Sequence, residues 1–450
     1  MPPRSATPPG PKGLPLVGSL LDFGREPLGF LTACARDHGD MVAFDLAGWR
    51  TFLLNHPDLA GYVLLGNHRN FVKHRFFWRH VEAIFGQGLL TSEGDFWLRQ
   101  RRLMAPAFHG QRLTAYGRTM VEFAERRVAD WRDGEVRNVH TEMMALTMEI
   151  VAECLFGAEM AADAARIGRA FDTITEVIQL RYRRPIRLPD WLPVPSNLRY
   201  RRGIRELEAL VYRIIAERRE GAEEREDLLS LLLAARDEDG SRMSDAQLRD
   251  EAITLFLAGH ETTALVLSWT WYLLSRHPEV EGRLGAELDE VLAGRPPAVE
   301  DLPRLRYTEQ VVTEAMRLFP PAWIIGRQAV EACEIGGYPV PAGSTIYFSP
   351  WVIHRDPRWF EEPESFRPER WGDGLAERLP RYAYMPFGGG PRVCIGNRFA
   401  MMEAVLLLAA IARRWRLRRL DEDPVRPFPT ITLRPQGGVP VRLERRGTRL

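Results

Sequence analysis

Apolar residues recur three and four positions apart over most of residues 57–330. This spacing places them on one face of a helix, so it predicts a mainly helical region. Residues 41–55 differ, because two strand-like runs flank Ala47 and Gly48, which predicts a β-hairpin. Three stretches have the clearest amphipathic helical spacing: 111–131, 141–156 and 203–220.

Two further stretches are apolar on nearly every side. Residues 245–278 predict a very long helix with an apolar centre, and residues 398–415 predict a final core helix. A helix of this kind lies in a large core or in a membrane. Glu261 in the first stretch argues against a membrane, and the longest apolar run, 404–412, is far shorter than the roughly 20 residues that span a bilayer. We therefore expect a soluble protein without a transmembrane segment, and the scattered cysteines indicate a cytoplasmic one.

The remaining sequence is less regular. Residues 181–202 are basic and punctuated by proline, which is typical of a solvated loop, although contact with a membrane or with an anionic substrate is also open. The acidic segment 221–230 precedes a further predicted helix. Residues 333–350 predict short strands and turns, and residues 356–393 are rich in proline, glycine, arginine and aromatic residues. The predicted fold class is therefore mainly α with a small β part.

Composition narrows the class of protein. The chain has 450 residues, of which 45% are hydrophobic and 27% charged, as in an ordinary globular enzyme. Its net charge of +1 gives no reason to expect nucleic-acid binding. The four cysteines form no CxxC pair, which argues against a disulfide scaffold. We expect one domain over residues 1–450, with a proline-rich lead-in at 1–16 that lacks the apolar core of a signal peptide.

One cysteine, Cys394, lies in the glycine-rich stretch 387–396, FGGGPRVCIG, just before the predicted final helix. Glycines let a ligand approach the backbone closely, and the start of a helix favours a thiolate. Four interpretations are open: a buried structural cysteine, a nucleophile, part of a four-thiolate metal site, or one axial ligand of a haem. No histidine lies near in sequence to act as a base, and the other thiolates of a metal site are missing. A single thiolate suits an axial haem position.

Three other short motifs hold polar residues in close spacing. Glu314 and Arg317 lie three apart on a predicted helix, and by themselves they indicate a weak surface ion pair. The stretch 258–263, AGHETT, places a glycine and a polar cluster inside the long apolar helix, where a structural kink is the alternative to a catalytic role. Trp97 and Arg101 share a helix face and by themselves indicate a cation–π pair.

Together these motifs resemble the cytochrome P-450 family. The stretch 387–396 is similar to the family's haem-binding loop, F-x-x-G-x-R-x-C-x-G, at every fixed position, and the other motifs occur in the family's order over nearly the whole chain. The resemblance implies the cytochrome P-450 fold, with haem b between the long central helix and the helix that follows the cysteine loop. It makes Cys394 the axial ligand of the haem iron. The residues that it implies for haem binding, with arginines on the propionates, are Trp97, Arg101, Ala258, Arg327, Phe387, Gly390, Arg392, Cys394 and Gly396.

The same resemblance assigns roles to the polar pairs. Glu261 and Thr262 match an acid–alcohol pair that delivers protons during oxygen activation. Glu314, Arg317 and Arg370 match a buried network that serves the fold and haem retention. His260 lies at a variable position, where helix packing and substrate contact are both open.

Position within the family also indicates a substrate pocket. Its residues are apolar, so we expect a hydrophobic small molecule, and we favour a terpenoid or fatty acyl compound of secondary metabolism. The pocket residues are Phe77, Ile84, Leu89, Phe256, Trp323, Ile324 and Ile431.

The resemblance predicts a monooxygenase that activates O₂ and hydroxylates or epoxidises its substrate. We expect a monomer without a fused reductase, which receives electrons from a separate ferredoxin and ferredoxin reductase. Arg392 and Arg398 near the cysteine loop either present a positive docking face or bind only propionates and solvent. A haem-thiolate peroxygenase or isomerase and a non-catalytic haem sensor are the alternatives. The Glu261–Thr262 pair argues against both.

Overall fold

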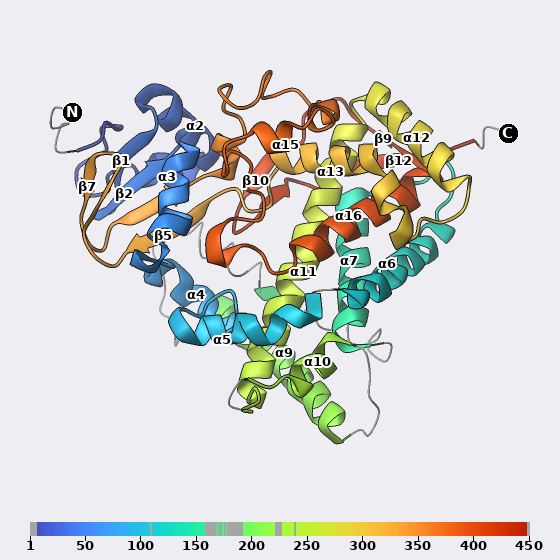
Figure 1. The fold of residues 1–450 in the computed structure, drawn as a ribbon, viewed down its shortest axis with the longest axis horizontal. Helices are drawn as coiled ribbons and strands as arrows, with labels where there is room; N and C mark the ends of the chain where they lie inside the picture. Colours follow the sequence, from blue (N-terminus) through green and yellow to red (C-terminus); the bar gives the residue numbers. More distant parts are fainter. Residues whose placement is uncertain are drawn as a thin grey trace. The chain divides into compact units, whose positions relative to one another are not determined.

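The computed structural model describes residues 7–447 except 109, 158–167, 169, 171–172, 175–176, 178–191, 221–226 and 238–239. The chain forms two compact units. Unit 1 consists of Met1–Trp78, Trp131–His140 and Leu265–Leu450, and unit 2 consists of Arg79–Asp130 and Thr141–Ala264. Three of the described helices have residues in both units: α4 (Arg75–Phe85), α7 (Val139–Phe156) and α11 (Asp245–Leu274), the last of which continues from unit 2 into unit 1 (Figure 1).

Unit 1 contains a five-stranded sheet in the order β1-β2-β8-β5-β3. The strands β1 and β2 pair in antiparallel fashion, with Met41 opposite Leu54, which confirms the predicted hairpin. The turn residues Ala47 and Gly48 have φ angles of 49° and 88°, the left-handed values that a two-residue hairpin turn favours. The strands are β1 (Met41–Leu46), β2 (Trp49–Leu54), β8 (Thr345–Phe348), β5 (Ile325–Ala329) and β3 (Phe71–Val72).

Both faces of this sheet are covered. Alternate residues of β1 enter two different cores, Met41 and Ala43 the first, Val42 and Phe44 the second. The helix α2 (Pro27–His38) closes the second core with Leu28, Leu31 and Cys34. A sheet buried on both faces explains why these strands read as continuous apolar runs.

The described part of unit 1 also contains three smaller sheets. A three-stranded sheet contains β4 (Val136–Asn138), β12 (Pro440–Arg445) and β9 (Trp415–Arg419). Two hairpins contain β6 (Cys333–Ile335) with β7 (Tyr338–Val340), and β10 (Pro427–Pro429) with β11 (Leu433–Pro435). The strands predicted at 333–350 are confirmed by β6 and β7 of one small sheet and by β8 of the large one.

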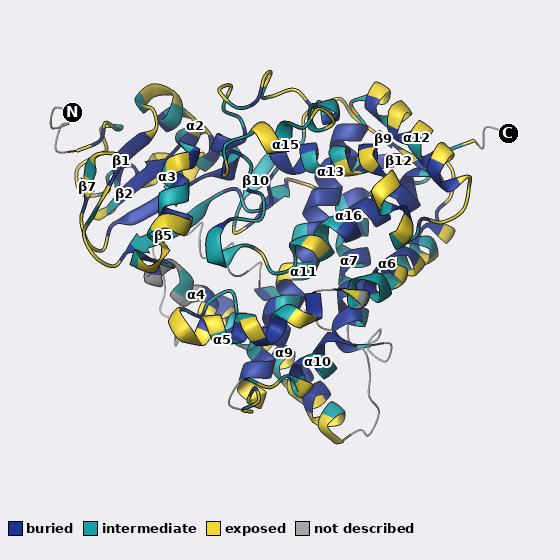
Figure 2. Cartoon of the chain, in the orientation of Figure 1, coloured by how far each residue is buried: buried dark blue, intermediate teal, exposed yellow. Residues whose placement is uncertain are grey.

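The helices of unit 1 include the predicted final core helix, α16 (Asn397–Ala412). Every residue from Met402 to Ala412 is buried, as a helix apolar on all sides requires (Figure 2). The other helices are α1 (Leu20–Arg25), α3 (Pro57–Gly61), α12 (Pro278–Leu292), α13 (Arg306–Leu318), α14 (Pro350–Ile353) and α15 (Leu375–Arg378). Short turns are the π-helical η1 (Tyr62–Gly66) and the 3₁₀ turns η2 (His68–Asn70), η5 (Val299–Arg304), η6 (Pro368–Trp371) and η7 (Gly390–Arg392).

Unit 2 is helical, and its helices confirm the predicted periodic stretches. Unit 2 contains most of α4 (Arg75–Phe85), most of α7 (Val139–Phe156) and the first part of α11. It also contains the whole of α5 (Gly94–Met104), η3 (Ala105–Phe108), α6 (Gln111–Ala129), α9 (Pro195–Glu220) and α10 (Leu228–Ala234). The predicted helix after the acidic segment is α10, which Asp227 caps by accepting the Ser230 N–H at 2.8 Å.

Two boundaries were predicted wrongly, since α10 already begins at Leu228, inside the acidic segment 221–230. The loop expected over 181–202 extends too far, because α9 begins at Pro195. Proline suits the first turn of a helix, where its missing N–H would have no intrahelical partner. Residues 181–191 lie outside the described part of the chain.

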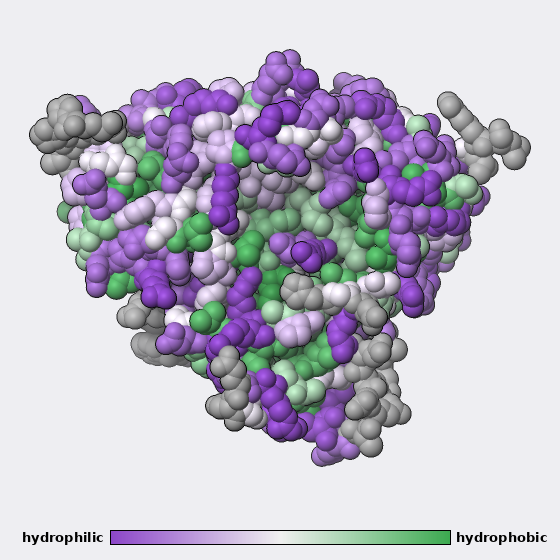
Figure 3. All heavy atoms as spheres, viewed as in Figure 1, coloured by the Kyte–Doolittle hydropathy of each residue, from purple (hydrophilic) through white to green (hydrophobic). Residues whose placement is uncertain are grey.

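None of the described helices combines the length and the hydropathy that crossing a bilayer requires. Hydrophilic residues predominate on the drawn surface around α12 and α15 (Figure 3). The described residues form a mainly helical structure with small sheets, which confirms the predicted fold class.

Candidate active site

Cys394 lies between the turn η7 and the start of α16 at Asn397. Its backbone N–H donates to the Phe387 carbonyl at 3.0 Å, and the Val393 N–H donates to the Gly390 carbonyl at 3.1 Å, so the loop closes on itself. Cys394 is exposed, whereas Cys34 and Cys154 are buried. Cys394 is therefore not a buried structural cysteine. Burial raises the pKa of the Cys34 thiol to about 12, which keeps that group protonated.

Glycine is required in this loop because it packs directly on another turn. Gly390 has a φ of 64°, and a Cβ atom there would lie 1.8 Å from the Leu64 carbonyl oxygen of η1. A Cβ atom on Gly389 would lie 2.3 Å from the Tyr382 ring. The shape of the cysteine loop is therefore set by its fit against η1 and Tyr382.

The donor set around Cys394 fits a cofactor that brings its own metal ligands. In the part of the chain that the structure describes, no three His, Cys, Asp or Glu side chains gather as a metal site. A lone accessible thiol before a helix can supply one axial bond to an iron whose other ligands come from a porphyrin. A haem fits these residues, and a four-thiolate centre does not.

Two arginines predicted for the propionates lie in unit 1 near the cysteine loop. Arg392 belongs to η7, and Arg327 belongs to β5, where its guanidinium donates to the Gly326 carbonyl at 2.9 Å. The neighbouring Ile325 side chain lies 3.9 Å from the position of a Cβ atom on Gly388, so β5 runs beside the loop. Both arginines are half-buried.

The third predicted propionate site is in unit 2, on α5. The Arg101 guanidinium carbon lies 5.8 Å from the centre of the Trp97 ring, and the Trp97 side chain is buried. The two residues share one helix face, as their spacing predicted. That the Arg101 guanidinium binds a haem propionate stays a prediction.

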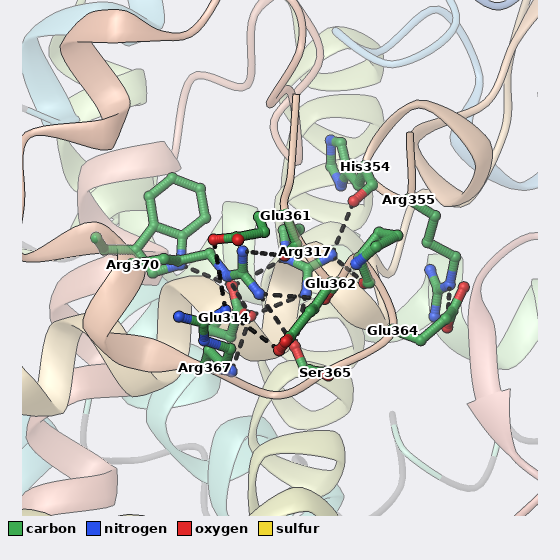
Figure 4. A network of polar contacts seen from close by, with 12 residues as sticks. Glu314, Arg317, His354, Arg355, Glu361, Glu362, Glu364, Ser365, Arg367 and Arg370 are labelled. Atoms are coloured by element: carbon green, nitrogen blue, oxygen red, sulfur yellow. Dashed lines mark hydrogen bonds and ion pairs between the residues drawn. The ribbon is translucent and has the colours of Figure 1, made fainter. Parts of the chain in front are cut away.

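The structure brings Glu314, Arg317 and Arg370 together in a buried network of unit 1 (Figure 4). Arg317 donates to both Glu314 carboxylate oxygens at 2.8 and 2.9 Å, and Arg370 donates to Oε1 at 2.9 Å. The remaining N–H groups of Arg317 donate to the carbonyls of His354, Pro363 and Ser365. This satisfies all five guanidinium donors, so the buried charge is fully paired.

Sequence reasoning missed two members of this network. The first is Trp371, whose indole N–H donates to Glu314 Oε2 at 2.8 Å. Its position beside Arg370 in the sequence was a signal that could have identified it. His354 is fully buried, and its Nε2 atom accepts the Met385 N–H at 2.9 Å. Burial, followed by the charges of Arg317 and Arg355, lowers the pKa of His354 to about 3. His354 therefore connects the Glu314 network, as a neutral ring, to the segment that leads into the cysteine loop.

The AGHETT segment forms an accessible stripe on α11. Between Glu251 and Leu274, every residue is buried except Leu255, Ala258, Gly259 and Thr262. These positions follow helical spacing, so they share one face. Leu255 was missed, although it lies three residues before Ala258 and seven before Thr262. The stripe is a place where a ligand can contact an otherwise buried helix.

Two backbone carbonyls of this segment accept hydrogen bonds from threonine side chains. Thr262 Oγ1 donates to the Ala258 carbonyl at 2.7 Å, and Thr147 Oγ1 of α7 lies 2.9 Å from the His260 carbonyl. A Cβ atom on Gly259 would approach Val151 of α7 at 3.0 Å, so glycine allows close packing there. Glu261 is buried beside the stripe, with 8% of its surface exposed.

The predicted pocket residues differ in their surroundings. Phe256 is buried and stacks on Phe156 at 6.3 Å, and Ile84 is buried as well. Trp323 is buried and donates its indole N–H to the Thr430 carbonyl at 2.9 Å, which joins it to the turn that carries the exposed Ile431. Leu89 and Ile324 are half-buried. The Phe77 side chain lies outside the described part of the chain, and a pocket role for these residues stays a prediction.

Comparison with known proteins decides the family, because the family model for cytochrome P-450 matches residues 8–440. The chain belongs to the cytochrome P-450 family. Cyclooctatin synthase of Streptomyces melanosporofaciens is 42% identical over 426 residues, which cover 94% of this chain and 92% of that protein. Cyclooctat-9-en-7-ol 5-monooxygenase of the same organism is 38% identical over 444 residues, or 96% and 94% of the two chains. Pentalenene oxygenase of Streptomyces avermitilis is 38% identical over 424 residues, 94% of each chain.

Membership in the cytochrome P-450 family confirms the predicted enzyme class and the predicted cofactor. The protein is an oxidoreductase of the monooxygenase type, and its cofactor is haem b. Bacterial members of the family generally receive electrons from separate redox proteins.

Proposed function

We propose that this cytochrome P-450 inserts oxygen into a cyclic terpenoid hydrocarbon or alcohol. The observation that carries the proposal is the accessible stripe on α11, where Leu255, Ala258 and Gly259 offer apolar or small surfaces and Thr262 offers one hydroxyl. A hydrocarbon skeleton has few groups that can form hydrogen bonds, so such a substrate is recognised by shape and apolar contact. The names of two relatives give cyclooctat-9-en-7-ol and pentalenene as their substrates, which supports this class over a fatty acyl compound.

In the proposed site, haem b supplies the reductive activation of O₂. Cys394 would hold the iron through its thiolate, in a loop that Gly390 fits against η1. Arg101, Arg327 and Arg392 would hold the propionates, because a guanidinium binds a carboxylate through two parallel hydrogen bonds.

Glu261 and Thr262 would move protons in this reaction. The Thr262 hydroxyl donates to the Ala258 carbonyl at rest, and a rotation of the side chain would free its proton for the oxygen being reduced. The neighbouring Glu261 carboxyl would then return a proton to Thr262 Oγ1. The overall reaction consumes the substrate, O₂, two electrons and two protons, and it yields the hydroxylated product and water.

NADPH would supply the two electrons through a ferredoxin reductase and a ferredoxin. Arg398 and Arg102, exposed beside the cysteine loop and on α5, would favour an acidic electron carrier. A monomer is sufficient for this cycle.

The test combines a binding screen with turnover. Purified ferric protein is titrated with pentalenene, cyclooctat-9-en-7-ol, a long-chain fatty acid and a steroid, and each is then incubated with NADPH, ferredoxin and ferredoxin reductase. We expect a spectral shift and a product with one added oxygen atom from a cyclic terpenoid only. A product from the fatty acid or the steroid alone would contradict the substrate class. Equal turnover with peroxide in place of NADPH would favour a peroxygenase, and no product under either condition would favour a sensor.

A further inference from the structure

The loop between α4 and α5, residues 86–93, is bound to α11 through its backbone. The Gln87 N–H donates to Asp250 Oδ2 at 2.7 Å, and the Leu89 N–H donates to Glu251 Oε2 at 2.8 Å. Glu251 is fully buried. Two adjacent carboxylates on α11 therefore hold two alternate amides of the loop, all within unit 2.

The glycines of this loop show how closely it lies on the helix. Gly86 has a φ of 52°, and a Cβ atom there would lie 2.1 Å from both Asp250 carboxylate oxygens. A Cβ atom on Gly88 would lie 2.2 Å from Thr254 Oγ1. The Thr91 hydroxyl donates to the Gly86 carbonyl at 2.7 Å and closes the loop on itself. The loop is thus a fixed turn packed on α11.

Arg249 extends this contact to α9. Its guanidinium donates to Asp250 Oδ1 at 2.6 Å and to Glu208 Oε1 of α9 at 2.6 Å. The Arg249 side chain is only 7% exposed, so solvent screens these charges little. The hydrogen bond from Arg249 to Oδ1 orients the Asp250 carboxylate, so that Oδ2 accepts the Gln87 N–H.

We propose that Arg249, Asp250 and Glu251 are positioning residues that set substrate selectivity by fixing the α4–α5 loop. The loop carries Leu89 and follows Ile84. Leu255, the first residue of the accessible stripe, lies one helical turn after Glu251. The carboxylates therefore fix where the loop side chains lie relative to the stripe. A pocket wall whose backbone is hydrogen-bonded to two carboxylates of a packed helix is preformed, and such a wall can discriminate by shape between apolar substrates. The inference rests on the proposed function in taking Leu255 as a substrate contact, and on the predicted pocket in taking Ile84 and Leu89 as its other contacts.

The first measurement follows the loop itself by amide hydrogen exchange of residues 86–92 in the ferric holoprotein. Glu251→Ala removes the acceptor of the Leu89 N–H, and we expect exchange there to rise about tenfold. Glu251→Gln keeps an acceptor oxygen and should exchange like the wild type. Asp245→Asn is the matched control, because Asp245 is an acidic residue of α11 that pairs with Arg219 at 2.5 Å. It should leave exchange in the loop unchanged.

The second measurement asks whether the loop sets selectivity. Imidazole, 1-phenylimidazole and clotrimazole are titrated spectrally against each variant, since azoles of increasing size probe the pocket whatever the natural substrate is. We expect Glu251→Ala to change the ratio of the clotrimazole and imidazole Kd values about fivefold or more, and Glu251→Gln to restore the wild-type ratio. The reduced CO spectrum of both variants should stay unchanged.

Unchanged exchange in Glu251→Ala would overturn the proposal, and so would faster exchange with an unchanged azole ratio. If Glu251→Ala does not retain haem, Asp250→Ala decides by the same two measurements, because it removes the acceptor of the Gln87 N–H. A wrong substrate class would alter neither measurement, so the two proposals fail separately.

Discussion

Cys394 differs from the other three cysteines in its surroundings rather than in its chemistry. Cys34 is buried in an apolar core, Cys154 is also buried, and burial raises the pKa of Cys333. Cys394 alone is exposed, just before a helix N-terminus that favours a thiolate. The surrounding backbone therefore favours this thiol, out of the four, for the metal binding that we propose.

Cys394→Ser should remove the thiolate-type spectrum of the reduced CO complex, because a serine hydroxyl does not supply the same electron-rich ligand. The measurement is a reduced CO difference spectrum at matched haem content. Cys333→Ser is the control and should keep the wild-type band. A thiolate-type band in Cys394→Ser would contradict the assignment of the axial ligand.

His354 should make the protein less stable in mild acid. Its folded pKa is about 3, whereas an unfolded histidine binds a proton below about pH 6.5. Between these two pKa values the unfolded chain binds more protons than the folded protein. The free energy of unfolding therefore decreases as the pH is lowered, by up to about 1.4 kcal/mol per pH unit. Urea unfolding at pH 7 and pH 5 measures this loss. His354→Gln keeps an acceptor for the Met385 N–H and has no titrating ring, so its loss should be smaller. Equal losses in the two proteins would contradict the prediction.

At the scale of elements, the contact between η7 and η1 shapes the cysteine loop. Gly390→Ala should reduce haem incorporation severely, since its Cβ would overlap the Leu64 carbonyl at 1.8 Å. The haem content and the thermal midpoint of the purified protein measure the effect. Gly437→Ala is a matched control, because Gly437 also has a positive φ, 78°, but no atom lies within 4 Å of its Cβ position. Gly437→Ala should lower the free energy of unfolding only by the strain of an alanine at that φ, about 1 kcal/mol. Similar losses in the two variants would mean that the close contact is unimportant.

The Glu314 network joins α13 to the segment around η6. Glu314→Gln should lower the free energy of unfolding by about 3–5 kcal/mol, because it leaves two buried arginines without their carboxylate. Chemical unfolding of the holoprotein measures the loss. Glu309→Gln, on the exposed face of the same helix, should change stability by less than about 0.5 kcal/mol. A loss below about 1 kcal/mol in Glu314→Gln would contradict a tightly paired network.

At the scale of the whole molecule, we predict that the two units unfold together as one domain. The chain passes between them at four points, one of which lies inside α11 between Ala264 and Leu265. Separate unfolding of either unit would break the helical hydrogen bonds that cross this point. Guanidinium unfolding followed by far-UV circular dichroism and by tryptophan fluorescence should give coincident transitions. Two separated transitions would show that the chain forms two domains.

Prediction from the sequence was most successful where one local pattern decides the element. The hairpin at 41–55 follows from two apolar strand-like runs around a two-residue turn, and the core helix at 398–415 follows from an apolar pattern on all sides. The start of α9 was missed because Pro195 was taken as a break, whereas proline is accepted in the first helical turn. His354 was missed because its partner is distant in sequence, and a hydrogen bond over that distance has no periodic signature. Trp371 also has a distant partner, and its position beside Arg370 was the one signal for it.

The sequence by itself determined the family, the thiol that binds the haem in our proposal, and the order of the polar motifs, because these depend on residue identity at fixed spacing. Only the tertiary structure decided which face of α11 is accessible and which groups complete the Glu314 network. It alone placed Asp250 and Glu251 on the backbone of the α4–α5 loop. The physical reason is that burial and hydrogen-bond partners depend on elements from distant parts of the chain, so no local pattern specifies them.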